Sequence, residues 1–89
     1  MTEERLAEVL SQLQVSDLLL QTLSTVASLA YHRLSEEHRD LDQVRLAIEA
    51  LRALLPVVSG SLPAEVVRDL EQVTANLQLS YAAAVPPVV

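Results

Sequence analysis

The sequence predicts an all-α protein: a small helical bundle of three core helices plus an N-terminal helix, assembled into an oligomer. Apolar residues recur at the i, i+3, i+4, i+7 spacing of one helix face along most of the 89-residue chain. Glycine occurs once and proline four times, so helix breaks are few. This length suits a single domain over 1–89, with an N-terminal helical extension (1–15), core helices (16–84) and an apolar tail (85–89).

The first helix is expected over residues 3–14, with Thr2 as its N-cap. Its apolar residues share one face: Leu6, Val9, Leu10 and Leu13. The second helix is expected to take Ser16 or Asp17 as its N-cap, because apolar periodicity follows at once, and to end near Leu34. The polar stretch 35–40 is then a solvated connection.

The third helix is expected to begin after Asp40, since Gln43 stands three residues later as in a capping box. It continues to about Leu55, or to Ser59 with a kink at Pro56, because proline removes one helix hydrogen bond and clashes with the preceding turn.

The sharpest break comes at residues 59–63. Gly60 suits the left-handed position after a helix, and Pro63 suits the first turn of the next helix. The fourth helix is expected over about 64–83 and ends before Pro86 and Pro87. Its apolar residues form one stripe: Val66, Leu70, Val73, Leu77, Tyr81 and Ala84.

The second and third helices carry more apolar surface than one neighbour can cover. Residues 18–32 hold no formally charged side chain, and the apolar arc of this helix spans roughly 220°. The third helix has a second apolar stripe beside its main one, and a helix that is apolar over most of its circumference is buried on more than one side. The candidate oligomer interface comprises Leu18, Leu19, Leu20, Leu23, Val26, Ala27, Ala30, Leu46, Ala50, Ala53 and Val57.

Three explanations remain open for this extra apolar surface. A second copy can cover it, which makes the protein its own partner in a homodimer or a higher oligomer. The copies can also exchange their N-terminal helices. Alternatively, the first helix and the C-terminal tail of the same chain cover it. A third reading is a groove between the second and third helices that binds a small apolar ligand or an amphipathic helix of another protein.

Composition argues against several classes of partner. The formal net charge is −6, and the six basic residues are scattered arginines without any lysine, so neither nucleic acid nor an anionic membrane surface is an expected partner. The acidic N-terminus lacks the basic region of a signal peptide, and the uncharged stretch is shorter than the ~20 residues of a membrane span. Cysteine is absent, so a disulfide framework is excluded. We expect a cytoplasmic protein.

No catalytic constellation or cofactor motif stands out, and we expect neither enzymatic activity nor a cofactor. The two histidines are His32 and His38, and His32 and Glu36 would share a face if the helix continued that far. Transition-metal sites need three or four convergent ligands, so these residues are better read as a polar connection. The Ser59–Ser61 segment has one glycine and no lysine, which does not make a phosphate-binding loop.

A set of core and turn positions stands out in the third and fourth helices: Asp40-Leu41, Val44, Ile48-Glu49-Ala50-Leu51, Gly60-Ser61-Leu62 and Leu77-Gln78-Leu79-Ser80-Tyr81. Through these residues the chain resembles a family of small bacterial proteins, the domain of unknown function 1844, over roughly residues 17–82. The chain departs from the family at Val57-Val58, Ser61 and Gln78, where the family carries its more polar residues. The resemblance implies a small all-helical domain of bacterial origin, and it adds nothing about catalysis because the family has no established activity.

Overall fold

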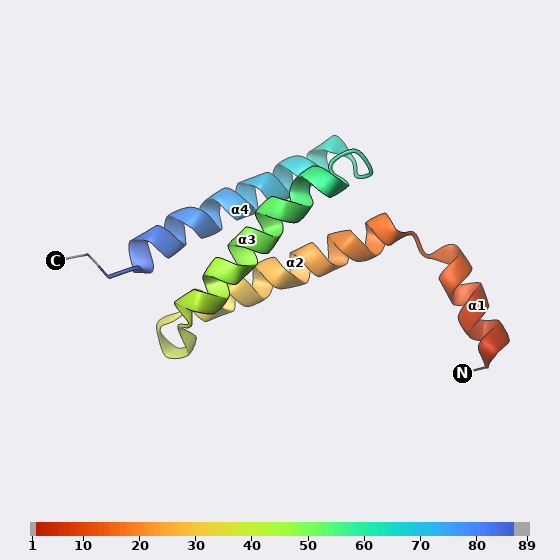
Figure 1. Ribbon diagram of the computed structural model, residues 1–89, viewed down its shortest axis with the longest axis horizontal. Helices are drawn as coiled ribbons and strands as arrows, with labels where there is room; N and C mark the ends of the chain where they lie inside the picture. Colours follow the sequence, from red (N-terminus) through yellow and green to blue (C-terminus); the bar gives the residue numbers. More distant parts are fainter. Residues whose placement is uncertain (1, 87–89) are drawn as a thin grey trace.

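The computed structural model describes residues 2–86, and this part of the chain is helical without a β-strand. α2, α3 and α4 pack against one another with alternating direction, whereas α1 stands clear of them (Figure 1). The predicted all-α fold is confirmed, and so is the division into three core helices and one N-terminal helix. The elements are α1 (Glu3–Gln12), α2 (Val15–Leu34), the short 3-10 helix η1 (Glu36–His38), α3 (Leu41–Val58) and α4 (Ala64–Ala84).

The two N-terminal helices begin differently from each other. The side chain of Thr2 accepts a hydrogen bond from the backbone N–H of Arg5 at 3.3 Å, as predicted for the N-cap of α1. The prediction of Ser16 or Asp17 as the N-cap of α2 is wrong. The backbone N–H groups of Asp17 and Leu18 already donate to the carbonyl of Gln14, so α2 begins at Val15 and its N-cap makes no side-chain hydrogen bond.

Local polar contacts hold the corner between α2 and α3. The guanidinium of Arg39 donates from Nε and Nη2 to the carbonyl oxygen of Leu34, at 3.2 and 2.9 Å, and so satisfies one of the orphan carbonyls at the end of α2. The backbone N–H of Asp40 donates to the carbonyl of Arg33 at 2.9 Å. The side chain of Asp40 then accepts from the backbone N–H of Gln43 at 3.3 Å, which confirms Asp40 as the N-cap of α3.

The longer of the two predicted ends of α3 is the one observed, since the helix runs through Pro56 to Val58. The prediction of a left-handed Gly60 is wrong, because no residue between 2 and 86 has a positive φ. Ser59 keeps right-handed helical dihedrals, and the N–H of Ser61 donates to the carbonyl of Val58 at 2.9 Å, so an ordinary turn closes the helix. Pro63 is the N-cap of α4 rather than a member of its first turn.

The hydrophobic core lies between α2, α3 and α4. α3 supplies most of it, with a stripe that includes Val44, Leu51 and Val58 at seven-residue intervals. The fourth helix contributes the predicted stripe, and buried Thr74 satisfies its hydroxyl by donating to the carbonyl of Leu70 at 2.8 Å. The buried apolar residues are Leu23, Ala27, Ala30, Val44, Ala47, Ile48, Leu51, Leu55, Val58, Leu70 and Leu77.

The chain exposes more surface than a compact protein of its mass. Its accessible surface is 6687 Å², whereas a folded monomer of 9.7 kDa exposes about 5,100 Å², a difference of about 1,600 Å². The radius of gyration is 16.2 Å, against about 12 Å for a compact domain of this length. The projecting α1 and the thinness of the bundle, 16 Å along its shortest axis, both add to this excess.

Leu51→Ala tests the core. Leu51 is fully buried in the central helix, so we expect the substitution to lower the free energy of unfolding by about 2–5 kcal/mol. Leu79 is 72% exposed on α4, and Leu79→Ala is the matched control, with an expected change of at most about 0.5 kcal/mol. Urea unfolding followed by circular dichroism measures both, and equal losses in the two variants would contradict this assignment of the core.

Gly60→Ala tests the turn between α3 and α4. A Cβ at this position meets no atom within 4 Å, and the backbone there does not need a positive φ. We therefore expect the substitution to raise the free energy of unfolding by about 0.4–1 kcal/mol, because alanine restricts the unfolded chain more than glycine does. Thermal unfolding measures the change, and a loss of stability would indicate that Gly60 adopts the left-handed conformation after all.

Candidate functional site

An apolar hollow lies between α2 and α3. Its volume is about 280 Å³, and every residue that lines it belongs to one of these two helices. Leu29 and Leu46 stand on its two sides and are 55% and 58% exposed, so large apolar side chains face solvent there. Only Arg33 and Gln43 are polar among its lining residues: Val26, Leu29, Ala30, Arg33, Gln43, Leu46, Ala47 and Ala50.

A second, more open depression adjoins the hollow at Val26 and is lined by α2 alone. Exposed Leu18 lies at its far end, and its other lining residues are polar: Gln21, Thr22 and Thr25. On α3, the residues that follow Leu46 and Ala50 at helical spacing are Ala53 and Val57, both exposed. α2 and α3 run in opposite directions (Figure 1). We call the hollow and the apolar residues that flank it along the two helices the α2/α3 groove: Leu18, Val26, Leu29, Leu46, Ala50, Ala53 and Val57.

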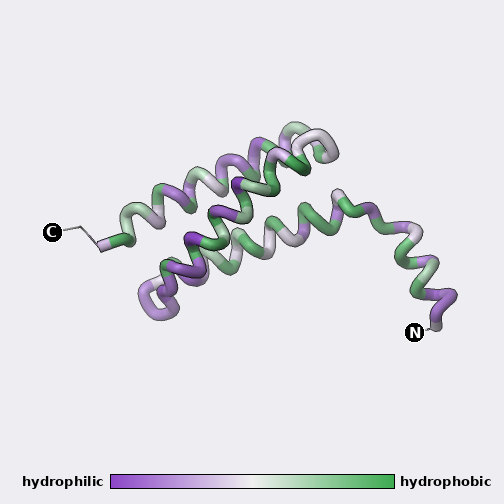
Figure 2. Tube along the Cα trace, in the orientation of Figure 1, coloured by the Kyte–Doolittle hydropathy of each residue, from purple (hydrophilic) through white to green (hydrophobic). Residues whose placement is uncertain are grey.

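A second unpartnered apolar surface is the stripe of α1. All four of its members are exposed, from 41% for Val9 to 58% for Leu10, and α1 packs against none of the other helices. Figure 2 shows hydrophobic residues recurring along this separate arm as they do along the core helices. The first helix therefore does not cover the extra apolar surface of α2 and α3 within the same chain. We call its members the α1 stripe: Leu6, Val9, Leu10 and Leu13.

The two apolar surfaces carry opposite charge at their ends. α1 has Glu3 and Glu4 in its first turn, where a carboxylate interacts favourably with the positive end of the helix dipole. The groove has Arg33 at the end where α2 stops. Within residues 2–86, the ion pairs are His38 with Glu37 at 4.0 Å and Arg45 with Glu49 at 3.3 Å, so Arg33 is not engaged in one.

The structure separates the predicted interface residues into three groups. Leu23, Ala27 and Ala30 are buried in the chain's own core, and of these three only Ala30 also lines the hollow. Leu19 and Leu20 are half-buried and pack against that core from the side. The remaining six all belong to the groove: Leu18, Val26, Leu46, Ala50, Ala53 and Val57.

The groove also includes residues that the sequence prediction left out. Leu29 and Arg33 continue the line of Val26 along α2 at helical spacing, and that spacing was the signal that could have identified them. The turn residues Gly60 and Pro63 do break the chain between α3 and α4, although by other conformations than predicted. The tail residues 87–89, part of the predicted apolar tail, lie outside the described residues.

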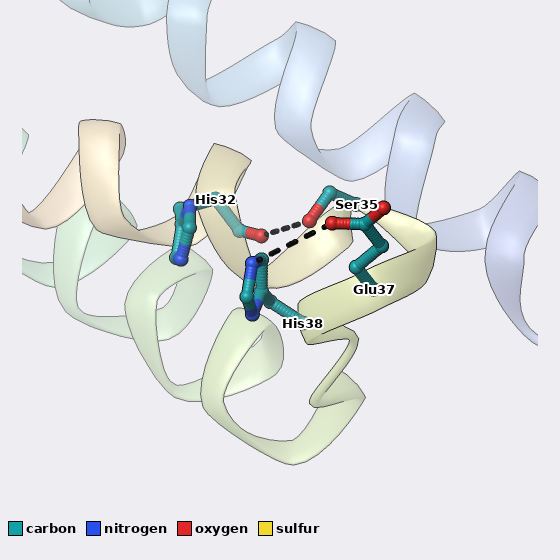
Figure 3. A network of polar contacts seen from close by, with 4 residues as sticks. All are labelled: His32, Ser35, Glu37 and His38. Carbon is teal, nitrogen blue, oxygen red and sulfur yellow. Dashed lines mark hydrogen bonds and ion pairs between the residues drawn. The ribbon is translucent and has the colours of Figure 1, made fainter.

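The two histidines come together at the α2–α3 corner. Their rings stack with centroids 4.4 Å apart and an interplanar angle of 23°, and the carboxylate of Glu37 approaches Nε2 of His38 (Figure 3). Because α2 ends at Leu34, the helical spacing of His32 and Glu36 does not form. Imidazole lone pairs lie in the ring plane, so stacked rings do not aim them at one point. No group of three or more potential metal ligands occurs in the described part of the chain.

Comparison with protein-family models, curated proteins and solved structures finds no match to this chain. The resemblance to the domain of unknown function 1844 therefore stays a prediction. Among the helices of residues 2–86, none combines the length and the apolarity that crossing a lipid bilayer requires. The described part of the chain thus offers a partner an apolar groove, an amphipathic helix that packs against no other helix, and charges of opposite sign on the two.

Proposed function

We propose that this chain is a non-enzymatic assembly module of the cytoplasm that binds further copies of itself through the α2/α3 groove. The observation that supports this most directly is the line of large apolar side chains facing solvent from both helices. Leu29 and Leu46 are each more than half exposed, although residues of this kind stabilise a protein chiefly when they leave water. Single exposed leucines are common, whereas several exposed apolar side chains around one apolar hollow are typical of an interaction site.

The size of the surface excess also supports self-association. A standard stable interface buries about 800 Å² on each partner, and the chain exposes about 1,600 Å² more than a compact monomer of its mass. The second copy is also the partner whose concentration is always matched to that of the chain. Symmetric self-association through one repeated patch is the commonest form of assembly among soluble proteins.

Leu46→Glu tests the assembly. We expect the wild-type chain to show at least twice its 9.7 kDa mass by light scattering on a sizing column, over a range of protein concentrations. Leu46→Glu places a charge in the groove and is expected to raise the dissociation constant at least tenfold, since about 1.4 kcal/mol corresponds to that factor. Leu79→Glu, at a still more exposed site on α4, is the control and is expected to keep the wild-type mass.

The outcome that contradicts the proposal is a wild-type mass of 9.7 kDa at every concentration. Circular dichroism of each variant separates this result from misfolding. Because Leu46 is exposed, the glutamate variant keeps the helical content of the wild type.

A second candidate function follows from the hollow itself. Its volume of about 280 Å³ and its apolar lining approach the smallest ligand pockets in proteins, which start near roughly 300 Å³. Arg33 at its rim suits an apolar molecule with one anionic group. In this function the groove binds a small amphiphile instead of a second copy.

The dye 1-anilinonaphthalene-8-sulfonate, an apolar ring system with one sulfonate, tests this alternative. If the groove stays open in the assembled protein, dye fluorescence rises and saturates at one dye per chain, and Leu46→Glu abolishes the rise while Leu79→Glu does not. If a second copy fills the groove, we expect dye fluorescence per chain to fall as the protein concentration increases. Fluorescence that is the same in all three proteins would exclude the hollow as the dye site.

A further inference from the structure

α1 in isolation lacks the contacts that a helix of its length needs. It has 10 residues, and isolated helices shorter than ~12–15 residues are marginal in water. Most helices in proteins are stabilised by packing one apolar face, and the apolar face of α1 touches none of the other helices. Stabilising α1 therefore requires that the α1 stripe pack against an apolar surface of similar length.

The hollow of the α2/α3 groove matches the α1 stripe in length. The stripe extends from Leu6 to Leu13, which is about 10 Å at 1.5 Å per residue. On the same measure, the hollow follows α2 from Val26 to Arg33 for about 10 Å. Small side chains at Ala50 and Ala53 on the α3 side leave room for a third helix to approach.

The short link between α1 and α2 keeps α1 from reaching the hollow of its own chain. Leu6, the far end of the stripe, lies about 12 Å from Gln14 along α1. Val26, where the hollow begins, lies about 18 Å from Gln14 along α2, and Leu29 lies further still. If α1 folded back at Gln14, its stripe would stop about 6 Å short of the hollow. An α1 from a second copy has no such tether.

Charge favours one direction of docking. When α1 runs antiparallel to the partner's α2, the acidic first turn of α1 comes to the end of the groove where Arg33 lies. The positive end of the α1 dipole then meets the negative end of α2. The same arrangement keeps Glu3 and Glu4 away from Asp17, which lies in the first turn of α2.

We propose that α1 of one copy packs its apolar stripe into the α2/α3 groove of a second copy, and that the second copy returns its own α1 in the same way. This inference rests on the proposed assembly function and names the segment that makes the contact. Reciprocal exchange gives a closed two-fold dimer, in which both grooves and both stripes leave water. It also explains why α1 is amphipathic and yet packs against nothing in its own chain.

Complementation between two variants tests the exchange. Leu10→Glu places a charge in the α1 stripe and leaves the groove unchanged, whereas Leu46→Glu places a charge in the groove and leaves the stripe unchanged. In each variant alone, every contact between a stripe and a groove includes a glutamate, so we expect a mass of 9.7 kDa for each by light scattering. In a mixture, the intact α1 of Leu46→Glu meets the intact groove of Leu10→Glu, and we expect a heterodimer of twice that mass.

The controls use the same introduced residue at neutral positions. Ser11 lies on the side of α1 opposite the stripe, and Leu79 lies on α4, so Ser11→Glu and Leu79→Glu are expected to dimerise as the wild type does. In the same assay, Arg33→Glu is expected to weaken the dimer severalfold, and adding Glu3→Arg to it restores affinity if the docking direction is the one proposed. A double variant that binds more weakly than Arg33→Glu alone would overturn that direction.

The outcomes distinguish this inference from the proposed function. If Leu10→Glu dimerises like the wild type while Leu46→Glu does not, the groove is an interface but α1 does not fill it. If both variants are monomeric and their mixture stays monomeric, reciprocal exchange is wrong. If the wild type is itself monomeric, the assembly function fails together with the inference.

Discussion

The bundle depends on the burial of one stripe of α3 between two neighbours. Val44, Leu51 and Val58 recur every seven residues and are almost fully buried, with α2 on one side and α4 on the other. α3 contacts both neighbours through this one stripe, so its second apolar stripe stays exposed. Leu46 and Val57 belong to this exposed stripe. The core has no further helix to cover it. The α2/α3 groove is thus a consequence of how the core is built.

The placement of α1 follows from a local feature with a long-range effect. Leu13 and Gln14 have extended backbone conformations and separate two helices by only two residues. A link this short holds α1 near the N-terminal end of α2 and far from the hollow at the other end. Because the link keeps the α1 stripe away from the hollow of its own chain, the stripe stays free to contact another chain. In the proposed dimer, the apolar surface that a monomer of this length leaves in water is buried between the two copies.

The polar corner between α2 and α3 has a structural role. Its histidines and carboxylates are residue types that can bind metals, yet they lie beside side-chain hydrogen bonds to the backbone that hold the turn between the two helices. Arg39 donates to the carbonyl of Leu34, Asp40 caps α3, and Ser35 donates to the carbonyl of His32 at 2.7 Å. These contacts fix the angle at which α3 returns along α2. With α3 returning along α2, Gln43 and Arg33 line the same hollow.

Periodicity and capping chemistry in the sequence by themselves determined the helices, the ends of α4 to within one residue, and Asp40 and Thr2 as caps, because these depend on neighbours a few residues away. The tertiary structure alone decided which apolar residues were covered. Leu23 and Leu29 look alike in sequence, but one is fully buried against the core and the other is 55% exposed, since α4 packs against only one side of the α2–α3 pair. The position of α1 was likewise invisible to local patterns, because it depends on where a two-residue link points.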